Sequence, residues 1–555
     1  MYKDKSNCRR LTKNAITEDT TTEYLNSIDK NNPPEPKQIE EELLEKLAYN
    51  FEVKHNSVAN KGRKWTIPDT LSACQIAMIL LYLHHIVRIS CTDKLSDEKS
   101  LLYIYQADGQ YKGLYQRDNR VFHKLIYQYN SAATEKDIAE VMKRLDVQAP
   151  QVLRNQDPDL VAVNNGIFDY KTKSLSPFSP DKVFLTKSMV DYVPNAVNPK
   201  ITEPDGHVWD VDSWLCSLSD DPEIQNLLWE IIGAVIRPNV RWNKSAWFYS
   251  TTGNNGKGTL CQLMRNICGE ASCTSISLSD FNQEFKLAEL LHASAIITDE
   301  NAIGSYVDNA ANLKAIVTGD MILLNRKFEN VITYRFHGFM VQCLNEYPKI
   351  RDRTDSFYRR QLFIPFDKCF TGQERKYIKD DYLRRPEVLQ YVLHKVLHMD
   401  YYTLSEPTSC VAALEQYKKF NDPVCAFADE FLFSDGILAW DFVPMGFLYD
   451  LYKAWYSKEY PRGNCLSKIE FKRRLTELVQ TNGKWELRDG VIKRPKKGME
   501  DPEPLIDEYN LTDWMNPRCT NKDVKRKCMP VLKATYRDVL ILCTATSNTP
   551  YRSVQ

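Results

Sequence analysis

Residues 246–267 read AWFYSTTGNNGKGTLCQLMRNI, and this stretch decides which fold we expect. An apolar and aromatic run at residues 246–249 leads into a loop of small polar residues at 251–258. The apolar positions that follow recur at the three- to four-residue spacing of one helix face: Leu260, Leu263, Met264 and Ile267. A strand, a glycine-containing loop with lysine and a helix, in that order, are typical of a phosphate-binding loop.

The loop supplies the groups that bind a nucleotide. Small residues let backbone N–H groups approach phosphate oxygens, and Lys257 is positioned to reach the β- and γ-phosphates. The predicted nucleotide-binding residues are contiguous: Gly253, Asn254, Asn255, Gly256, Lys257, Gly258 and Thr259. Thr251 replaces the first glycine of the common pattern, and Gly258 replaces the hydroxyl residue that usually holds Mg²⁺. Thr259 is therefore the nearest hydroxyl. The alternative is a glycine turn before an ordinary helix.

Two acidic residues follow the next apolar strand. Residues 293–301 read ASAIITDEN, so Asp299 and Glu300 come directly after a small, apolar run. Asp299 is predicted to hold Mg²⁺, directly or through water, and Glu300 to orient and deprotonate the attacking water. Acidic residues after a strand are also common at protein surfaces. Their place downstream of Lys257 favours a nucleotide-hydrolysing site.

Two further polar positions complete the predicted site. Residues 336–348 read FHGFMVQCLNEYP, and Asn345 at the end of this strand is predicted to sense the γ-phosphate. Alternatively, Asn345 caps a turn. Arg359 and Arg360 precede another apolar run in DSFYRRQLFIPFD, residues 355–367. An arginine here would stabilise transition-state charge in a neighbouring subunit. The alternative is a solvated pair, or one that binds acidic neighbours.

Five segments, taken in order, resemble the superfamily 3 helicases. The resemblance is strongest to the phage and plasmid primase-helicase group related to poxvirus replication helicases. The segments are NGKGT at 255–259, ITDEN at 297–301, LKAIVTGD at 313–320, NEYP at 345–348 and FYRRQLFIPF at 357–366. NNGIFDY at 164–170 is similar to the helical domain that precedes the ATPase in that family.

The resemblance implies a fold of the α/β class, with an AAA+-like P-loop ATPase core and a helical N-terminal domain. It also implies a homo-hexameric ring that hydrolyses ATP with Mg²⁺ and translocates on single-stranded DNA during replication. Lys257 and Thr259 would bind phosphates and Mg²⁺ opposite the acidic pair, and Asn345 would be the sensor. Arg360, ahead of Arg359, would be the finger that acts in trans.

The same resemblance implies a DNA-binding hairpin in a central channel. It corresponds to MILLNRKFEN, residues 321–330, with Arg326, Lys327 and Phe328 near its tip. A basic pair with an aromatic ring suits the phosphates and bases of a single strand. The alternative is that Phe328 is a core residue and that the charges solvate a turn.

The C-terminal region predicts a winged-helix-like DNA-binding unit. Residues 446–479 predict two helices, and GKWELRDGVIKRP at 483–495 predicts a two-stranded wing turned at Asp489 and Gly490. The candidate DNA contacts lie on the second helix and the wing: Lys468, Lys472, Arg473, Arg474, Lys493 and Arg494. Such a unit would bind origin duplex DNA, and the alternative is a solvated basic face.

Domain expectations follow from these motifs. Residues 1–68 predict a polar tail and a charged helix, 69–221 a helical and hairpin domain, 222–405 the ATPase core and 422–555 the DNA-binding region. The apolar stretch 71–87 predicts a buried helix, capped by Asp69 or Thr70, that is too short to span a bilayer. The N-terminal region is too short for a primase module, so a separate primase would be a partner.

Composition sets the outer limits. The 555 residues include 73 Lys+Arg and 73 Asp+Glu, so the formal net charge is zero. This balance excludes a uniformly basic nucleic-acid coat but permits local basic patches. The 15 cysteines include no C-x-x-C pair, and the N-terminus has no signal sequence, which together predict free thiols and a cytoplasmic protein without membrane contact.

The sequence therefore predicts an ATP-dependent DNA helicase and replication initiator of a phage, plasmid or mobile genetic element. One alternative is a DNA-binding initiator whose ATPase only regulates assembly. Another is a non-replicative ring ATPase that acts in defence or protein remodelling.

Overall fold

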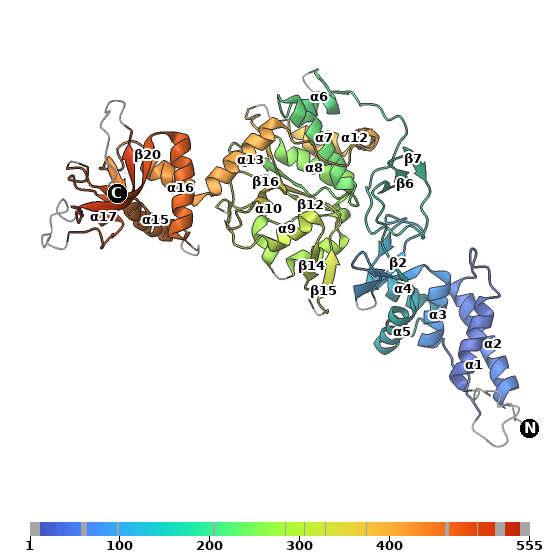
Figure 1. Cartoon of the computed structure of the whole chain (residues 1–555). Coiled ribbons are helices and arrows are strands. Elements are labelled where there is room, and N and C mark those ends of the chain that lie inside the picture. Colours follow the sequence, from blue (N-terminus) through green and yellow to red (C-terminus); the bar gives the residue numbers. More distant parts are fainter. Residues whose placement is uncertain are drawn as a thin grey trace, which may run out of the picture. The chain divides into compact units, whose positions relative to one another are not determined.

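The computed structural model describes residues 12–56, 64–96, 99–203, 206–283, 285–304, 306–327, 329–372, 375–460, 465–496, 498–516 and 528–543. The chain divides into two compact units (Figure 1). The first contains residues 1–302, 311–345 and 364–407, and the second contains 303–310, 346–363 and 408–555. Within the described ranges, no helix combines the length and the apolar surface that crossing a membrane requires.

The first unit opens with α1 Lys13–Leu25, α2 Pro36–Phe51 and α3 Ala73–Leu83. Helix α1 lies in the predicted polar tail, so that prediction is wrong for residues 13–25; residues 1–11 lie outside the described ranges. Ile16, Tyr24 and Leu25 are buried against α2 and its neighbours, and this packing outweighs the polar composition of the segment.

Helix α3 is the predicted buried helix, but its N-cap is Ser72 rather than Asp69 or Thr70. Ser72 and Gln75 form a capping box, in which each side chain meets the other residue's backbone N–H. The helix ends at Leu83, earlier than expected, because the chain extends into β1 Ile86–Ser90.

A four-stranded sheet and two more helices follow α3. The sheet has the order β3-β2-β1-β4, with β2 Ser100–Tyr105, β3 Tyr115–Gln116 and β4 Gln151–Val152. Strands β2 and β3 form the predicted hairpin, whose connection contains Gly109 at a φ of 73°. Helices α4 Asn119–Tyr129 and α5 Glu135–Gln148 complete this part.

The predicted second hairpin region is a three-stranded antiparallel sheet of β5 Leu160–Val163, β6 Gly166–Asp169 and β7 Ser174–Ser176. The chain continues through β8 Ile201–Thr202, β9 Val208–Trp209 and α6 Val211–Cys216. Helix α7 Pro222–Ile236 then begins at the predicted boundary of the nucleotide-binding part.

A five-stranded sheet has the order β11-β12-β16-β10-β18, and the first four strands of this order belong to the first unit. Its strands are β10 Ser245–Tyr249, β11 Cys273–Thr274, β12 Ala295–Thr298, β16 Phe339–Leu344 and β18 Gln361–Pro365. The pairs β11–β12, β12–β16 and β16–β10 are parallel. Strands β12 and β16 are buried at every residue, as expected for parallel strands covered on both faces. The α/β class is therefore confirmed.

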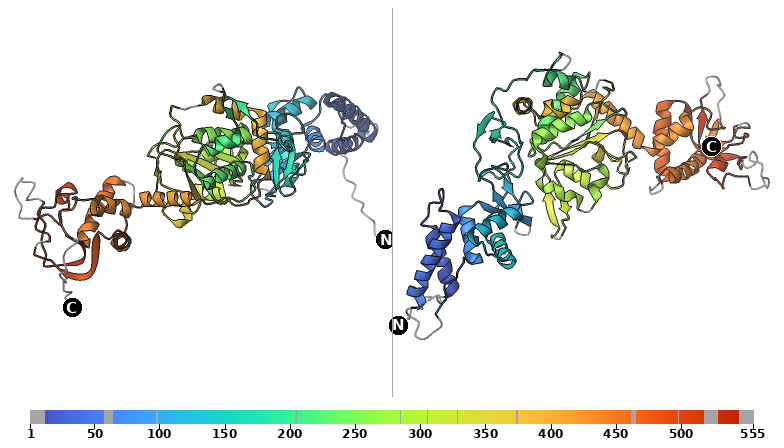
Figure 2. Two further views of the ribbon diagram at one scale, coloured as in Figure 1. Left: turned by 90° about the horizontal axis from the view of Figure 1, so that it is seen from above. Right: turned by 180° about the vertical axis from the view of Figure 1, so that it is seen from behind.

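Helices α8 Lys257–Cys268 and α9 Ala311–Thr318 lie on opposite sides of these strands in Figure 1. Helix α8 contacts α7, α11 Lys376–Asp380 and α12 Pro386–His398. Strands β14 Met321–Leu324 and β15 Ile332–Arg335 form an antiparallel hairpin, drawn in yellow, that projects from the sheet in Figures 1 and 2.

The second unit contains helices around a three-stranded antiparallel sheet with the order β19-β21-β20. Its elements are β13 Tyr306–Val307, β17 Lys349–Ile350, α10 Asp355–Tyr358, α13 Thr408–Asn421, α14 Pro423–Ala428, β19 Phe442–Pro444, α15 Met445–Glu459, α16 Lys468–Asn482, β20 Trp485–Lys493, α17 Leu505–Glu508 and β21 Thr535–Leu542. Helices α15 and α16 are the two predicted helices, and they pack around a core rich in aromatic residues.

The predicted wing hairpin is wrong. Strand β20 runs through Asp489 and Gly490, where its pairing with β21 shifts register, and no turn occurs there. Gly490 has a φ of 92° and donates its N–H to Asp538 at 2.8 Å, so the glycine makes a bulge. Strand β21, which pairs with β20 and carries the buried Val539 and Leu540, lies in a part of the predicted DNA-binding region for which the sequence predicted no helix or strand.

Candidate nucleotide-binding site

The predicted phosphate loop joins β10 to α8, as the sequence pattern requires. Gly256 is the N-cap of α8 and has a φ of 85°. A Cβ placed on Gly256 would lie 2.6 Å from Leu218 Cδ2, so this position needs glycine for both its backbone and its space. The backbone N–H groups at the start of α8 therefore open towards the loop, in the arrangement that binds anions.

Lys257, the first residue of α8, is only 6% exposed. Its Nζ donates to the Leu344 carbonyl oxygen and to Asn345 Oδ1, each at 3.0 Å. Burial lowers the pKa of this amine, because its acceptors are neutral oxygens in a dry environment. Lys257 and Asn345 thus meet at the carboxyl ends of neighbouring parallel strands, the usual edge for ligands in such sheets.

Asp299 follows β12 and forms an ion pair that the sequence did not predict. Arg265 on α8 donates from Nη1 to Asp299 Oδ2 at 2.7 Å and from Nη2 to the Ile297 carbonyl oxygen at 2.8 Å. Asp299 Oδ1 is buried, and no described N–H or O–H group donates to it; the Cys261 thiol lies beside the same carboxylate. Mg²⁺ in nucleotide sites commonly takes one or two protein oxygens together with phosphate oxygens, and Asp299 Oδ1 fits that role.

The other two residues of this predicted set have different surroundings. Glu300 is exposed at the end of β12, where solvent reaches its carboxylate. Thr259 lies in the first turn of α8 and lines a cavity beside the loop. Joint coordination of one Mg²⁺ ion by Thr259 and Asp299 stays a prediction.

Asn301 is a positioning residue that sequence reasoning missed. Its Nδ2 donates to Gln342 Oε1 and to the Cys343 carbonyl oxygen, each at 3.0 Å, and its Oδ1 accepts from the Leu278 N–H. These bonds fix the end of β12 against β16. The signal in the sequence was the asparagine that directly follows the acidic pair in ITDEN.

The predicted arginine finger lies in the second unit. Arg359 is exposed after α10, and Arg360 is half-buried, with its Nη1 donating to Ser356 Oγ at 3.1 Å. Their role at a neighbouring subunit's nucleotide stays a prediction.

The predicted DNA-binding hairpin is only partly exposed. Arg326 is 9% exposed, pairs with Glu329 and donates to the Asn330 carbonyl oxygen at 3.2 Å. Glu329 also pairs with Arg117 at 2.7 Å. Lys327 is exposed between β14 and β15, and Phe328 lies outside the described residues. Lys327 is therefore better placed than Arg326 to meet a phosphate.

Three predicted DNA contacts of α16 are paired with acids. Lys472 contacts Asp489 at 2.6 Å and Asp538 at 2.9 Å. Arg473 and Arg474 both bind Glu470 and hold its pKa at about 2.

The remaining predicted contacts differ in exposure. Lys468 and Lys493 are exposed, and Arg494 is half-buried, with its Nη1 donating to the Pro495 carbonyl oxygen at 3.2 Å. Lys472, Arg473 and Arg474 are thus neutralised by acidic residues of α16 itself and of strands β20 and β21.

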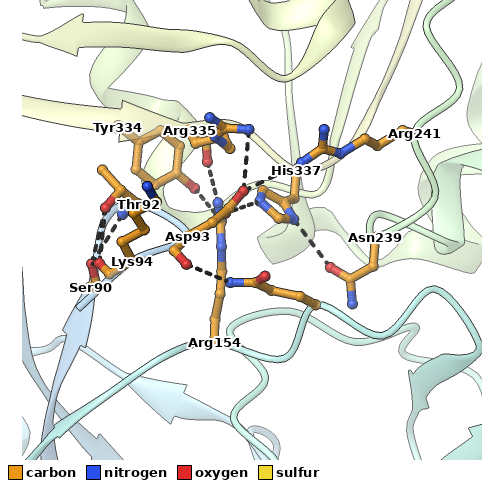
Figure 3. A network of polar contacts seen from close by, with 11 residues as sticks. Ser90, Thr92, Asp93, Lys94, Arg154, Asn239, Arg241, Tyr334, Arg335 and His337 are labelled. Carbon is orange, nitrogen blue, oxygen red and sulfur yellow. Dashed lines mark hydrogen bonds and ion pairs between the residues drawn. The ribbon is translucent and has the colours of Figure 1, made fainter.

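A partly buried charge network lies at the base of the β14–β15 hairpin (Figure 3). Asp93 accepts from His337 Nε2 at 3.0 Å and pairs with Arg335 at 3.2 Å and Arg241 at 3.5 Å. Arg154 donates to the Arg335 carbonyl oxygen and to the Tyr334 hydroxyl. The network ties the region before β5 to the end of β15, and the sequence did not indicate it.

Three regions of the chain match known families. Residues 93–233 match the family described as D5 N terminal like, and residues 419–516 match the family described as Poxvirus D5 protein-like. Residues 248–360, which contain the phosphate loop and both acidic residues, match a family of unknown function (DUF5906).

One curated relative and two solved structures are also similar. The putative helicase 121R of Invertebrate iridescent virus 3 is 22% identical over 238 residues, which cover 40% of this chain and 24% of that protein. The chain therefore spans about a quarter of that relative. Two apo structures of the NrS-1 C-terminal region share 13% identity and cover 85% and 84% of this chain and 100% and 99% of their own. Their TM-scores are 0.42 and 0.38, too low to carry an argument.

The fold defines a protein with an α/β core, in which a glycine-containing loop joins the parallel strand β10 to helix α8. Within that class, the two D5-type matches on either side of the loop confirm the predicted relationship to the D5-type primase-helicase family.

Proposed function

We propose that this protein is a superfamily 3 ATP-dependent DNA helicase that acts in the replication of a phage, plasmid or mobile genetic element. The observation that carries the proposal is the meeting of Lys257 and Asn345 at the sheet edge that also carries Asp299. The D5-type matches and the putative viral helicase among the relatives support it.

The chain's own residues would divide the work of hydrolysis. The Lys257 ammonium, now held by neutral oxygens, would turn to the phosphates, where a dry setting strengthens its attraction. Its departure would free Asn345 Oδ1 to hold the attacking water near the γ-phosphate. Glu300, which is exposed, would take the proton from that water.

Arg265 would position Asp299 by holding one oxygen of its carboxylate and leaving Oδ1 for Mg²⁺. Mg²⁺, when bound, neutralises phosphate charge. Arg265 touches neither ligand in this arrangement, so it is a positioning residue.

We further propose that the protein works as a homo-hexameric ring. Arg360 would complete the site of the neighbouring subunit, and Lys327 would contact single-stranded DNA during translocation. The exposed Lys468 and Lys493 of the C-terminal unit would contact the phosphates of origin duplex DNA. A separate primase would supply primers.

The test is ATP hydrolysis with and without single-stranded DNA, beside strand separation of a tailed duplex. The proposal expects hydrolysis that single-stranded DNA stimulates and separation that requires ATP. Stimulation without separation would favour an initiator whose ATPase regulates assembly. Hydrolysis that ignores DNA would favour a non-replicative ring ATPase.

A further inference from the structure

A cavity of about 580 Å³ lies beside the phosphate loop. Its walls come from residues between 208 and 218, from the loop and the first turn of α8, and from Phe370 and residues 375–380. The volume falls within the roughly 300–1,000 Å³ typical of small-molecule sites. The cavity shares Asn254, Gly256 and Thr259 with the loop, so any occupant would touch the proposed phosphate site.

One part of the cavity is apolar and aromatic. Trp209, Trp214, Leu218 and Phe370 line it. A Cβ on Gly256 would lie 2.6 Å from Leu218 and 3.7 Å from Phe370, so these side chains reach the loop itself. Trp209 is 5% exposed, and its indole Nε1 is buried without an acceptor among the described residues. This N–H is a donor available to a ligand.

The other part of the cavity carries more cations than acids. Arg375, Lys376 and Lys379 line it, all on or beside α11, and Asp210 and Asp380 are the acidic residues of the lining. A Cβ placed on Gly258 would lie 3.9 Å from Lys379 Nζ, so this ammonium stands over the position where phosphate loops usually carry a hydroxyl. Arg375 is held at 2.9 Å by the buried Glu203.

We propose that this cavity binds the nucleoside part of a nucleoside triphosphate and that Lys379 contacts its phosphates. The inference rests on the proposed ATPase function and names the rest of that site. A nucleotide has a flat aromatic base that stacks on aromatic side chains and a polyanionic tail that needs cations. The cavity likewise has an aromatic part and a part that carries cations, and both parts adjoin the loop.

Because Gly258 has no side chain, the Lys379 ammonium can contact phosphate at the position where phosphate loops usually carry a hydroxyl. A larger side chain at position 258 would meet the ammonium, whereas glycine leaves it access to the loop. The cation adds attraction to phosphate that a neutral hydroxyl does not supply.

The first experiment fills the cavity. Ser217 is exposed and lines it, so Ser217→Trp would occupy the space of the base; Cys216→Trp, at the exposed neighbour outside the lining, is the matched control. The probes are ATP hydrolysis and its inhibition by inorganic tripolyphosphate, which has no base. Ser217→Trp should raise the KM for ATP about tenfold or more, as expected from the loss of base stacking. It should leave tripolyphosphate inhibition unchanged, and Cys216→Trp should change neither.

The second experiment removes the cation. Lys379→Ala should weaken ATP and tripolyphosphate binding together, by about tenfold, the effect of losing one charged contact. Lys136→Ala, on the exposed face of α5, is its control.

The outcomes separate this inference from the proposed function. If the wild-type protein does not hydrolyse ATP, the proposed function fails. If it does, equal effects of Ser217→Trp on ATP and tripolyphosphate, or no effect on either, would overturn the assignment of the cavity. Unchanged tripolyphosphate inhibition in Lys379→Ala would overturn the role of Lys379.

Discussion

At the scale of single residues, the candidate site depends on which cations are paired with an acidic residue and which are not. Lys257 faces neutral oxygens, whereas Arg265 and Asp299 neutralise each other. This difference decides which cation is available to a phosphate. A lysine that must first give up two hydrogen bonds at 3.0 Å is held in place rather than mobile, so it is preorganised for its ligand.

Lys257→Ala should therefore reduce kcat by about 10²- to 10³-fold, the cost of removing one preorganised group that stabilises transition-state charge. Steady-state ATP hydrolysis measures this loss, with Lys136→Ala as an exposed lysine control and circular dichroism to verify folding. Wild-type turnover in Lys257→Ala would remove the phosphate-loop assignment.

His337 should make stability depend on pH. Burial, and then the nearby Arg154, lower its pKa from 6.5 to about 4 in the folded protein. Between these values the unfolded chain binds more protons, so stability should fall as the pH falls from about 6.5 to 4. The pKa of Asp93 is also lowered, chiefly by the hydrogen bond from His337. Protonation of Asp93 at low pH should therefore also reduce stability.

Urea unfolding at a series of pH values between 7 and 4.5 measures this dependence. His337→Gln keeps a polar side chain without the titration, so its stability should fall less over the same range. An identical slope for the variant and the wild type would show that His337 does not titrate as the structure requires.

At the scale of elements, a few specific contacts determine where a helix begins and which strands pair, rather than the composition of the segment. Helix α3 begins where Ser72 and Gln75 cap each other, although Asp69 and Thr70 stand nearby in the sequence. Strand β20 passes through an Asp-Gly pair that is typical of a turn, because strand β21 pairs with it on both sides of the bulge.

Ser72→Ala should lower the free energy of unfolding by about 1 kcal/mol, the usual cost of losing a helix N-cap. Thr70→Ala is the matched control and should change it by less than about 0.5 kcal/mol, as for a substitution away from such contacts. Urea unfolding monitored by circular dichroism makes the comparison. A larger loss of unfolding free energy in Thr70→Ala than in Ser72→Ala would show that Ser72 is not the N-cap.

At the scale of the whole molecule, zero net charge results from local pairing. The basic residues of α16 bind Glu470, Glu477, Asp489 and Asp538, so much of the local basic excess is neutralised in the folded unit. DNA contact would then depend on a few exposed lysines, and binding should have a modest salt dependence for the size of the protein.

The proposed nucleotide site shared between neighbouring subunits can be tested by mixing variant and wild-type subunits. Arg360→Ala subunits mixed with wild-type subunits should reduce ATP hydrolysis more steeply than dilution, because each variant also disables its neighbour. Titrating the variant at constant total protein measures this effect. A loss strictly proportional to the variant fraction would contradict a finger that acts in trans.

Sequence by itself determined the order of β10, the glycine-containing loop and α8, the strands that come directly before Asp299 and Asn345, and the helices α15 and α16. These features depend on local periodicity, on glycine and on strand-end polar residues, all of which neighbouring residues specify. Sequence also carried the D5-type relationship, because its motifs keep their order along the chain.

Only the tertiary structure decided the partners. Residues far apart in the sequence come into contact in ways that no local pattern encodes. Examples are the Arg265–Asp299 pair, the Asp93–His337 network, the β20–β21 pairing and the packing of the helix within the predicted tail. The cavity beside the loop likewise needs residues between 208 and 218, Phe370 and residues 375–380 to converge. Burial makes each such contact favourable, and burial is a property of the folded chain.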